Sequence, residues 1–408
     1  MNYFHWIAGT VLAAIWLSRV IDTSVGVRRL VNITRPEWDR NPATPSGNPR
    51  VTIVVPARNE EASVGQALSQ LLALDYDNYE VIAVDDRSTD GTGKIMDQFA
   101  DGRPPSSLEH AETWSQRHPG PGDGKLRVVH IKELPRGWMG KAHAMWSAAK
   151  LSTADWILFT DADVMFRPDC LRRAIAYAEA ERADHLVLFP RTIMKHPGEK
   201  MMLAFFQLMF VFGHRPWKVA DPKAKDHIGV GAFNLVRRKV YEAVGSYEAL
   251  RFEVVDDMKL GKVIKNAGFR QRNVLGEDLL ELHWAQGALG VVRNLTKNFF
   301  AVMSFQAWRA IGFCVAAAFI NIMPFAGVFL AHGGARIPYA VALGCLFFLY
   351  FGMSLFSDVR PWYVLLHPLG TLLFIYTMLR SMAFALRNRG VEWRGTMYPL
   401  DELRRGLV

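Results

Sequence analysis

The stretch 156-WILFTDADVMF-166 runs from four apolar residues into two aspartates separated by a single alanine, and more apolar residues follow. The apolar run has the length and the residue types of a buried strand. Two carboxylates at the end of such a strand, Asp161 and Asp163, are therefore the first candidates for a functional site. The alternative for an isolated Asp-x-Asp is a turn in which one aspartate caps the helix that follows.

Strands and helices alternate on both sides of this stretch. Short apolar or β-branched runs predict strands at 51–55, 79–86, 126–132 and 156–159, and periodic apolar patterns predict helices at 62–72, 94–99, 140–151 and 168–180. The segment 101–125 is rich in Pro, Gly and polar residues, and we expect it to be a surface excursion. The alternation predicts an α/β fold, with a mostly parallel sheet and helices on both of its faces.

Several acids converge on one edge of this predicted sheet. Asp85 and Asp86 end the run 81-VIAV-84, and Asp161 and Asp163 end the strand 156–159. In an open α/β sheet this carboxyl edge holds the ligand. Magnesium or manganese prefers oxygen ligands of this kind and completes its shell with substrate phosphates. A diphosphate leaving group needs such positive charge as its bond to a sugar breaks.

Four apolar blocks lie outside the globular middle of the chain. They occupy 3–17, 311–331, 338–356 and 362–386, and each is close to the ~20 residues that cross a bilayer. The first block lacks a basic region before it and a small-x-small cleavage site after it, so it predicts an anchor and not a signal peptide. Arginines follow this block, which by the positive-inside rule places the middle of the chain in the cytoplasm. We therefore expect a multi-pass protein of the cell (inner) membrane.

Cysteine content and charge agree with this location. The chain has three cysteines, too few for a disulfide framework, which fits a reducing compartment. The formal net charge of +9 comes from Lys and Arg that cluster beside the apolar blocks. We interpret this charge as facing anionic lipid, and we expect no nucleic-acid partner.

These features predict five parts. They are an N-terminal transmembrane anchor (1–22), a juxtamembrane linker (23–49), the globular domain (50–298), a membrane region of about three spans (299–387) and a basic tail (388–408). One span before the domain and three after it would leave the tail outside, whereas its arginines favour the inside. Either one C-terminal hairpin is re-entrant, or 297–308 begins an additional segment. The apolar run 201–212 is too short to span and predicts either a buried helix or an interfacial helix that admits a lipid.

An ordered set of motifs makes the metal hypothesis specific. It comprises Pro-Ala-Arg-Asn-Glu at 56–60, Val-Asp-Asp-Arg-Ser-Thr-Asp-Gly-Thr at 84–92, Gly-Trp-Met-Gly-Lys at 137–141 and Thr-Asp-Ala-Asp at 160–163. This order resembles the family 2 glycosyltransferases with the GT-A fold, and 231–247 and 255–261 resemble that family's acceptor-side loop and catalytic-acid motif. The resemblance covers roughly Val51 to Ala301. It implies a GT-A nucleotide-sugar-binding domain followed by transmembrane helices.

The resemblance also implies roles for individual residues. Pro56, Ala57, Asn59 and Glu60 would frame the nucleotide pocket, Asp85 or Asp86 would accept a hydrogen bond from the base, and Lys141 would lie near the nucleotide or its phosphates. Asp161 would lie by the ribose and phosphate, Asp163 would hold the divalent cation (Mg²⁺ or Mn²⁺), and His283 is a weaker candidate ligand. Asp257 would be the general base. Asp256 stands where the family usually has glutamate, which leaves its role less defined.

The implied reaction is a transfer with inversion at the anomeric carbon. A carboxylate removes the proton of the acceptor hydroxyl, and the cation stabilises the departing diphosphate of a UDP- or GDP-linked sugar. One carboxylate group is thus needed for the metal and another for the base, and the chain has both. The alternative for 253–261 is a helix start with favourable acids in its first turn, and the two interpretations are compatible.

The acceptor is suggested by the flanks of the domain. The strings 134-LPRGWMGKAHA-144 and 391-VEWRGTMYPL-400 look most like glycosyltransferases of hopanoid or carotenoid pathways and somewhat like ceramide glucosyltransferases, although Thr396 stands where an arginine is usual. The Gln-x-x-Arg-Trp motif of processive synthases is missing at 283–294. We therefore expect a membrane lipid hydroxyl as acceptor. The alternatives are a polyprenyl-phosphate glycosyltransferase and a non-catalytic membrane scaffold, and the intact acids at 161, 163, 256 and 257 argue against the scaffold.

Overall fold

The computed structural model describes residues 2–42, 44, 47–102 and 125–407, and it divides into two compact units. The sheet unit comprises Leu30–Arg191, Lys218–His283 and Arg405–Val408, and the helical unit comprises Met1–Arg29, Thr192–Trp217 and Trp284–Arg404. Most of the surface excursion expected at 101–125 lies outside the described residues.

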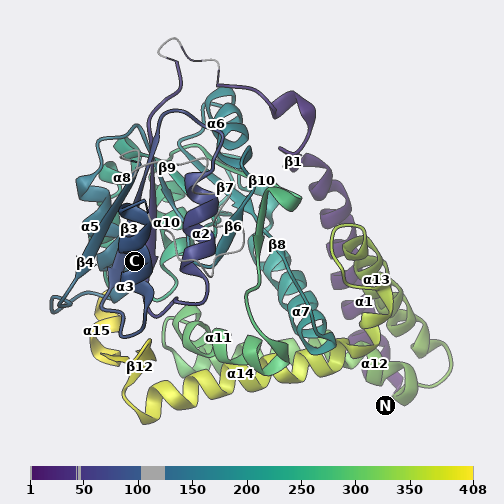
Figure 1. Ribbon diagram of the computed structural model, residues 1–408. Helices are drawn as coiled ribbons and strands as arrows, with labels where there is room; N and C mark the ends of the chain where they lie inside the picture. Colours follow the sequence, from purple (N-terminus) through teal and green to yellow (C-terminus); the bar gives the residue numbers. More distant parts are fainter. Residues whose placement is uncertain (1, 43, 45–46, 103–124, 408) are drawn as a thin grey trace. The chain divides into compact units, whose positions relative to one another are not determined.

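The sheet unit is built on an eight-stranded sheet with helices against it (Figure 1). Its strand order is β1 (Val31–Asn32), β10 (Gln271–Leu275), β7 (His185–Phe189), β9 (Asn234–Arg237), β5 (Trp156–Phe159), β2 (Val51–Ala57), β3 (Tyr79–Asp86) and β4 (Leu126–Ile131). Only β9 runs antiparallel to its neighbours among these described strands. The predicted GT-A-like α/β architecture, with a mostly parallel sheet, is therefore confirmed.

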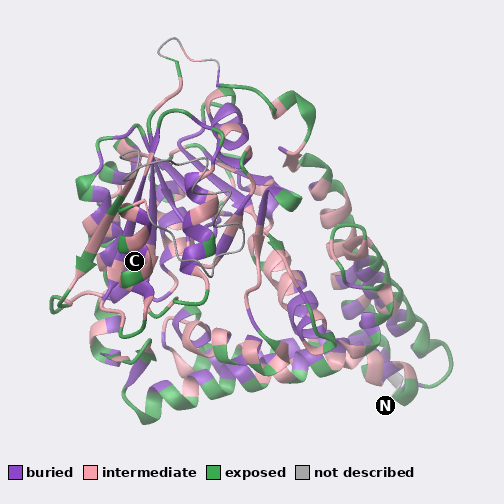
Figure 2. Cartoon of the chain, viewed as in Figure 1, coloured by how far each residue is buried: buried purple, intermediate pink, exposed green. Residues whose placement is uncertain are grey.

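The central strands are apolar on both sides because helices cover both faces of a parallel sheet. All four residues of β5 are buried, as are the first five of β2, and Figure 2 shows the burial along the strands. The helices are α2 (Val64–Leu72), α3 (Thr92–Ala100), α5 (Gly140–Leu151), α6 (Cys170–Ala180), α8 (Arg238–Ala243), α9 (Ser246–Ala249) and α10 (Asp256–Asn266). A three-stranded sheet adds β6 (Val164–Phe166), β11 (Leu280–Leu282) and β8 (Arg191–Thr192). The first four helices start within two residues of the predicted positions.

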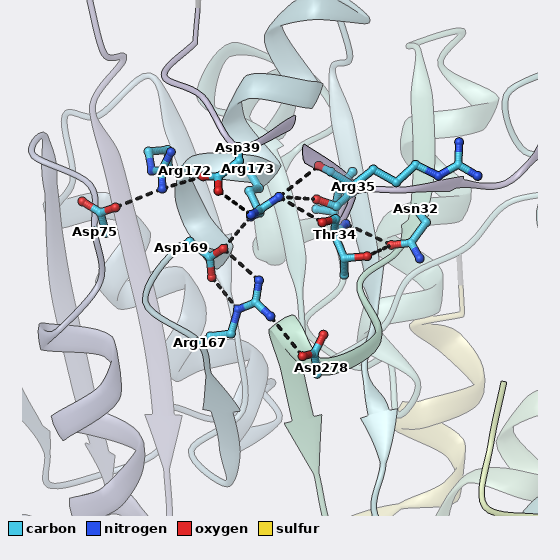
Figure 3. Close-up of polar contacts among 11 residues, drawn as sticks. Asn32, Thr34, Arg35, Asp39, Asp75, Arg167, Asp169, Arg172, Arg173 and Asp278 are labelled. Atoms are coloured by element: carbon cyan, nitrogen blue, oxygen red, sulfur yellow. Dashed lines mark hydrogen bonds and ion pairs between the residues drawn. The ribbon is translucent and has the colours of Figure 1, made fainter. Parts of the chain in front are cut away.

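Part of the segment predicted as a linker is fixed to the sheet unit. Strand β1 pairs with β10, and the chain after it lies on α6 (Figure 3). The buried Arg173 guanidinium donates to the carbonyls of Ile33, Thr34 and Arg35 at 3.0 to 3.3 Å, and it forms ion pairs with Asp39 and Asp169. One arginine thus satisfies three backbone acceptors and two carboxylates at once.

A second arginine completes this charged cluster. Arg167 binds Asp169 with two hydrogen bonds of 2.6 and 2.8 Å and also reaches Asp278 at 3.0 Å. The hydrogen bond from Arg167, reinforced by that from Arg173, lowers the pKa of Asp169 to about 2. The carboxylate is therefore charged throughout the physiological range and holds both guanidinium groups in place.

The helical unit contains four helices that are long and apolar enough to cross a membrane. They are α1 (Asn2–Gly26), α12 (Ala307–Leu330), α13 (Arg336–Ser354) and α14 (His367–Arg387). Their outward side chains are large and apolar, for example Phe329 and Ile337, which are 80% and 63% exposed. The apolar-block prediction is borne out to this extent, since these helices are candidate spans by length and composition.

Two shorter helices and a C-terminal hairpin complete the helical unit. They are α7 (Pro197–His214), α11 (Gly287–Val302), β12 (Gly390–Trp393) and β13 (Thr396–Pro399), followed by α15 (Leu400–Arg405). In α7 the residues 201–205 are buried, while Phe206, Met209 and Phe210 are only partly covered. The run 201–212 is thus a helix with one buried face, and contact of its other face with lipid stays a prediction.

We expect Arg173→Met to lower the free energy of unfolding of the purified protein by about 1 to 3 kcal/mol, because the change removes the buried guanidinium that satisfies three backbone carbonyls and pairs with the partly buried Asp169. Arg127→Met, on the exposed side of β4, is the matched control and should change it by less than about 0.5 kcal/mol. Denaturant unfolding in detergent measures both. Equal stability of the two variants would contradict the role of Arg173.

Candidate functional site

The acids at the carboxyl edge of the sheet gather around one lysine. Lys141 lies in the first turn of α5, and its Nζ donates to Asp161 Oδ1 at 2.6 Å. Asp161 is the second residue after β5, and Thr160 between them is fixed by a hydrogen bond from its hydroxyl to the Ala232 carbonyl. The start of α5 therefore places the ammonium group of Lys141 at the carboxyl end of β5, beside the Asp-x-Asp pair.

The charge of Lys141 acts on two further carboxylates. Burial alone would lower the pKa of Lys141, but the charges of Asp161, Asp256 and Asp257 outweigh it and raise the pKa above its ordinary value. Burial raises the pKa of Asp256 to about 7, against the opposing effect of Lys141, and one of its oxygens, Oδ2, has no hydrogen-bond partner among the described residues. Lys141 is therefore the common counter-ion of three acids from two segments far apart in the sequence.

The carboxylate of Asp257 is oriented by two backbone amides. Gly231 donates its N–H to Oδ2 at 2.8 Å, and Met258 donates to Oδ1 at 2.7 Å. Burial raises the pKa of Asp257, and the pKa stays raised although Lys141 and the two amides lower it. Asp257 begins α10 beside Asp256, so the free amides of the helix start and the loop at 228–231 hold it together.

Close backbone contacts explain the glycines around Asp257. A side chain at Gly229 would overlap the backbone carbonyl of Asp257, and one at Gly261 would overlap the carbonyl of Ile228. The loop 228–231 thus lies directly on the first turns of α10. Gly229 was not predicted as part of the site, and Gly231 was predicted only as the start of the loop 231–247. The closely spaced glycines at 229 and 231 were the available signal, since glycine permits close backbone approach.

Asp163 lies in the turn between β5 and β6. Burial, together with the nearby charges of Asp161 and Glu60, raises its pKa to about 6. A cation at this place would offset three neighbouring negative charges, so the donor set suits a divalent ion with oxygen ligands. Among residues 2–42, 44, 47–102 and 125–407, however, no cluster of three or more His, Cys, Asp or Glu side chains has the arrangement of a metal site.

The two acids that end β3 point to opposite sides of the sheet, as neighbours in a strand do. Asp86 lies toward α5, where a side chain at Gly140 would collide with its carboxylate, and it is paired with Arg87 at 2.8 Å. Asp85 lies toward α3 and contacts His130 at 3.0 Å. His130 also reaches Asp97, and these two carboxylates raise its pKa. Of the pair, Asp86 is on the side of Lys141.

The predicted nucleotide-pocket residues after β2 are tied to the loop after β3. Pro56 and Ala57 end β2 beside Val84 and Asp85. Asn59, at a positive φ of 56°, accepts the Thr89 N–H at 2.8 Å, and Glu60 donates its N–H to Thr92 at 2.8 Å. These bonds fix two neighbouring loops of the carboxyl edge to each other.

His283 follows β11 and is partly exposed. It belongs to no cluster of candidate metal ligands within the described part of the chain. Its role as a ligand stays a prediction, as do the roles assigned to the other site residues.

Sequence comparison now identifies the domain. Residues 52–245 match the model of the family "Glycosyl transferase family 2". This part of the chain is a glycosyltransferase family 2 domain. The matched range contains Asp86, Lys141 and the Asp161–Asp163 pair, and it ends eleven residues before Asp256. The family resemblance and the prediction of a glycosyltransferase are thereby confirmed.

Related proteins extend the similarity to the rest of the chain. The 4,4'-diaponeurosporenoate glycosyltransferase of Staphylococcus aureus (strain USA300) is 21% identical over 372 residues, covering 86% of this chain and 89% of the relative. The protein of the same name from the bovine strain RF122 / ET3-1 is 22% identical over 362 residues, with the same coverage. This similarity confirms the carotenoid-associated resemblance.

A solved structure shows the same fold. It is the mannosyltransferase PcManGT from Pyrobaculum calidifontis in complex with GDP-Man and Mn²⁺, with a TM-score of 0.52 and 21% identity over 93% of this chain and 98% of that chain. The similarity supports the GT-A-like fold of the family 2 glycosyltransferase described here.

We expect Lys141→Met to reduce sugar transfer about 100-fold or more, because it removes the positive charge shared by three carboxylates. Lys150→Met is the matched control. Lys150 is on the same helix and is exposed, and its Nζ lies 4.3 Å from the centroid of the Trp146 ring. Transfer from radiolabelled UDP- and GDP-sugars to a membrane lipid extract measures both. Equal activity of the two variants would remove Lys141 from the site.

Proposed function

We propose that this family 2 glycosyltransferase moves one sugar from a UDP- or GDP-linked donor to the hydroxyl of a membrane lipid, with inversion at the anomeric carbon. The observation that carries the proposal is the meeting of Asp161, Asp256 and Asp257 around Lys141. One group of acids lies at the end of β5, where a nucleotide diphosphate binds in this sheet topology, and the other presents an oriented carboxylate.

Asp257 acts as the general base in this proposal. Its two oxygens are aligned by the amides of Gly231 and Met258, and its raised pKa keeps it basic enough to take a proton from an alcohol near neutral pH. The acceptor oxygen forms a bond to the anomeric carbon, the bond from that carbon to the diphosphate oxygen breaks, and the proton of the hydroxyl moves to Asp257. The buried Asp256 lies next to Asp257 at the start of α10, and both carboxylates interact with the charge of Lys141.

The nucleotide-sugar donor would bind to residues that follow β2, β3 and β5. Asn59 and Glu60, with Pro56 and Ala57, would frame the nucleotide, and Asp86 is better placed than Asp85 to accept a hydrogen bond from the base, because Asp85 lies toward His130. Lys141 would contact the phosphates while it remains paired with Asp161. These positions follow from the loops that the hydrogen bonds of Asn59 and Glu60 hold together.

A divalent cation, Mg²⁺ or Mn²⁺, fits the acids of this edge. Asp163 and Asp161 would hold it, and the pKa of Asp163 is raised by burial and, after that, by the nearby charges of Asp161 and Glu60. When bound, the ion would neutralise charge on the diphosphate as it leaves. His283 would be an additional ligand only after its side chain approached the acids.

The acceptor is assigned from the helical unit and from the relatives. Four candidate spans with exposed apolar side chains accompany the domain, and 4,4'-diaponeurosporenoate glycosyltransferase matches 86% of the chain. A lipid with an isoprenoid or sphingolipid-like body and a hydroxyl group fits both facts. The enzyme would work at the cytoplasmic face of the cell membrane.

We expect Asp257→Asn to abolish transfer, with a loss of at least 10²- to 10⁴-fold, because the base is removed. Its affinity for UDP or GDP in the presence of MnCl₂ should stay within about threefold of the parent. Asp163→Ala should instead lose the manganese dependence of nucleotide binding. Calorimetric titration of the purified variants measures both.

Each arm can fail separately. Full transfer by Asp257→Asn would remove that residue from the base role, and an unchanged manganese titration of Asp163→Ala would remove the metal assignment. Labelled product in the neutral lipid fraction supports a hydroxyl acceptor. Product in the anionic, acid-labile fraction would support a polyprenyl phosphate in its place.

The membrane topology is proposed from contacts within the helical unit. Arg404 donates to the Phe305 carbonyl at 3.1 Å, and the Lys297 ammonium lies 4.0 Å from the centroid of the Trp393 ring. The tail therefore meets the chain where α12 begins. At the other end of α14, His367 is buried against Asn321 in the middle of α12, so 361–387 starts inside the bundle and returns toward the start of α12. This supports a re-entrant segment and a cytoplasmic tail.

We expect green fluorescent protein fused after Val408 to fluoresce in cells, and a cysteine introduced at Gly333 to react with an impermeant maleimide from outside. Residues 331–335 join the candidate spans α12 and α13, so the loop and the tail belong to opposite sides. Alkaline phosphatase activity of a fusion after Val408 would contradict the re-entrant topology.

A further inference from the structure

Behind the Asp257 loop lies a buried chain of polar side chains. It consists of Gln271 on β10, His185 on β7 and Asn234 on β9, which are 1%, 0% and 1% exposed. Gln271 Nε2 lies 2.7 Å from His185 Nδ1, and His185 Nε2 contacts Asn234 Oδ1. Asn234 Nδ2 lies 3.5 Å from the backbone carbonyl of Asp257. The chain thus runs across three adjacent strands and ends at the candidate base.

The hydrogen bonds of this chain have a single direction. The amide of Gln271 donates to Nδ1 of His185, so the imidazole carries its proton on Nε2 and donates to the oxygen of Asn234. The NH₂ group of Asn234 then faces the Asp257 carbonyl. Burial lowers the pKa of His185 to about 4, which keeps the ring neutral near neutral pH and preserves this direction.

Gln271 also holds the two backbone segments that meet at Asp257. Its oxygen accepts the Ile228 N–H at 3.0 Å, and its NH₂ group shares two hydrogens among His185 Nδ1 and the carbonyls of Ile228 and Gly261, which lie 3.0 and 3.2 Å away. Ile228 begins the loop whose Gly231 amide binds Asp257 Oδ2, and Gly261 lies one turn further along α10. One side chain therefore couples the loop that orients the carboxylate to the helix that carries it.

We propose that Gln271, His185 and Asn234 are positioning residues that set the Asp257 carboxylate for proton removal. This inference rests on the proposed role of Asp257. The contacts of this chain toward the site are to backbone atoms of Ile228, Asp257 and Gly261, so the three residues act through the backbone of the loop 228–231 and of α10. A buried polar network is favourable only when each member is satisfied. Here the hydrogen bonds of Gln271 and Asn234 to backbone atoms hold the loop 228–231 against α10.

The test compares two substitutions at one position. His185→Gln keeps an acceptor and a donor in the side chain, whereas His185→Leu removes both at a similar volume. We expect His185→Leu to lower kcat about 10- to 100-fold, because small displacements of a reacting group cost rate in this range, while KM for the nucleotide sugar stays within about threefold. His185→Gln should recover most of kcat. The assay is UDP or GDP release from UDP-glucose and GDP-mannose with membrane lipid extract.

Controls separate positioning from folding. Asn273→Leu changes another buried amide on β10, whose Nδ2 has no hydrogen-bond partner in the described residues, and it should leave kcat within about threefold. If His185→Leu does not fold, Gln271→Met takes its place, with the same expected fall in kcat. Nucleotide titration with MnCl₂ confirms that each variant tested has a folded donor site.

The outcomes distinguish this inference from the proposed function. Loss of activity in Asp257→Asn together with normal kcat in His185→Leu or Gln271→Met would overturn the positioning role alone. A rise in KM with unchanged kcat would overturn it as well, since the network would then support only the donor site. Full activity of Asp257→Asn would overturn the base assignment first, and with it the function of this network.

Discussion

The candidate site depends on one interaction, that of the Lys141 ammonium group with the carboxylates of Asp161, Asp256 and Asp257. Asp161 comes from the end of β5 and Asp256 and Asp257 from the start of α10, nearly one hundred residues later. Three carboxylates in a partly buried place repel one another, and the neutral form of each becomes favoured as water is excluded. The charge of Lys141 offsets this repulsion, which is why its pKa is raised although burial alone would lower it. The same charge would meet the phosphates of a nucleotide.

The close approach of backbone segments follows from this convergence. Asp257 can accept the Gly231 amide only because the loop 228–231 lies against α10, and Gly229 and Gly261 leave no side chain in the way. Behind this contact the network of Gln271, His185 and Asn234 replaces apolar packing. Its cost is the burial of three polar side chains, and its advantage is direction, since hydrogen bonds fix geometry more narrowly than apolar contacts do.

The helical unit also contains buried polar side chains that are hydrogen-bonded to one another. His367, Asn321 and Tyr350 are buried between candidate spans and satisfy one another at 3.0 and 3.1 Å. Polar groups at such positions are tolerated when they find partners inside the bundle. In the sheet unit, the buried Arg173 guanidinium is likewise satisfied by partners. It binds the carbonyls that follow β1, and β1 pairs with β10 at the edge of the sheet.

The sequence by itself determined the alternation of strands and helices, the apolar blocks and the motif order that indicates a family 2 glycosyltransferase. These features are local: strand and helix periods, runs of about 20 apolar residues and short motifs are legible without knowledge of distant contacts. Thus α5 was predicted with its observed bounds, the acids at 161 and 163 were candidates because they follow a strand, and those at 256 and 257 were candidates through the family resemblance. Only the tertiary structure decided which residues meet. Asp85 and Asp86 are adjacent in sequence but face opposite sides of β3, Arg173 binds carbonyls about 140 residues away, and His185 joins strands that are neighbours only in the sheet. Such partners are chosen by strand order and packing, which no short stretch of sequence encodes.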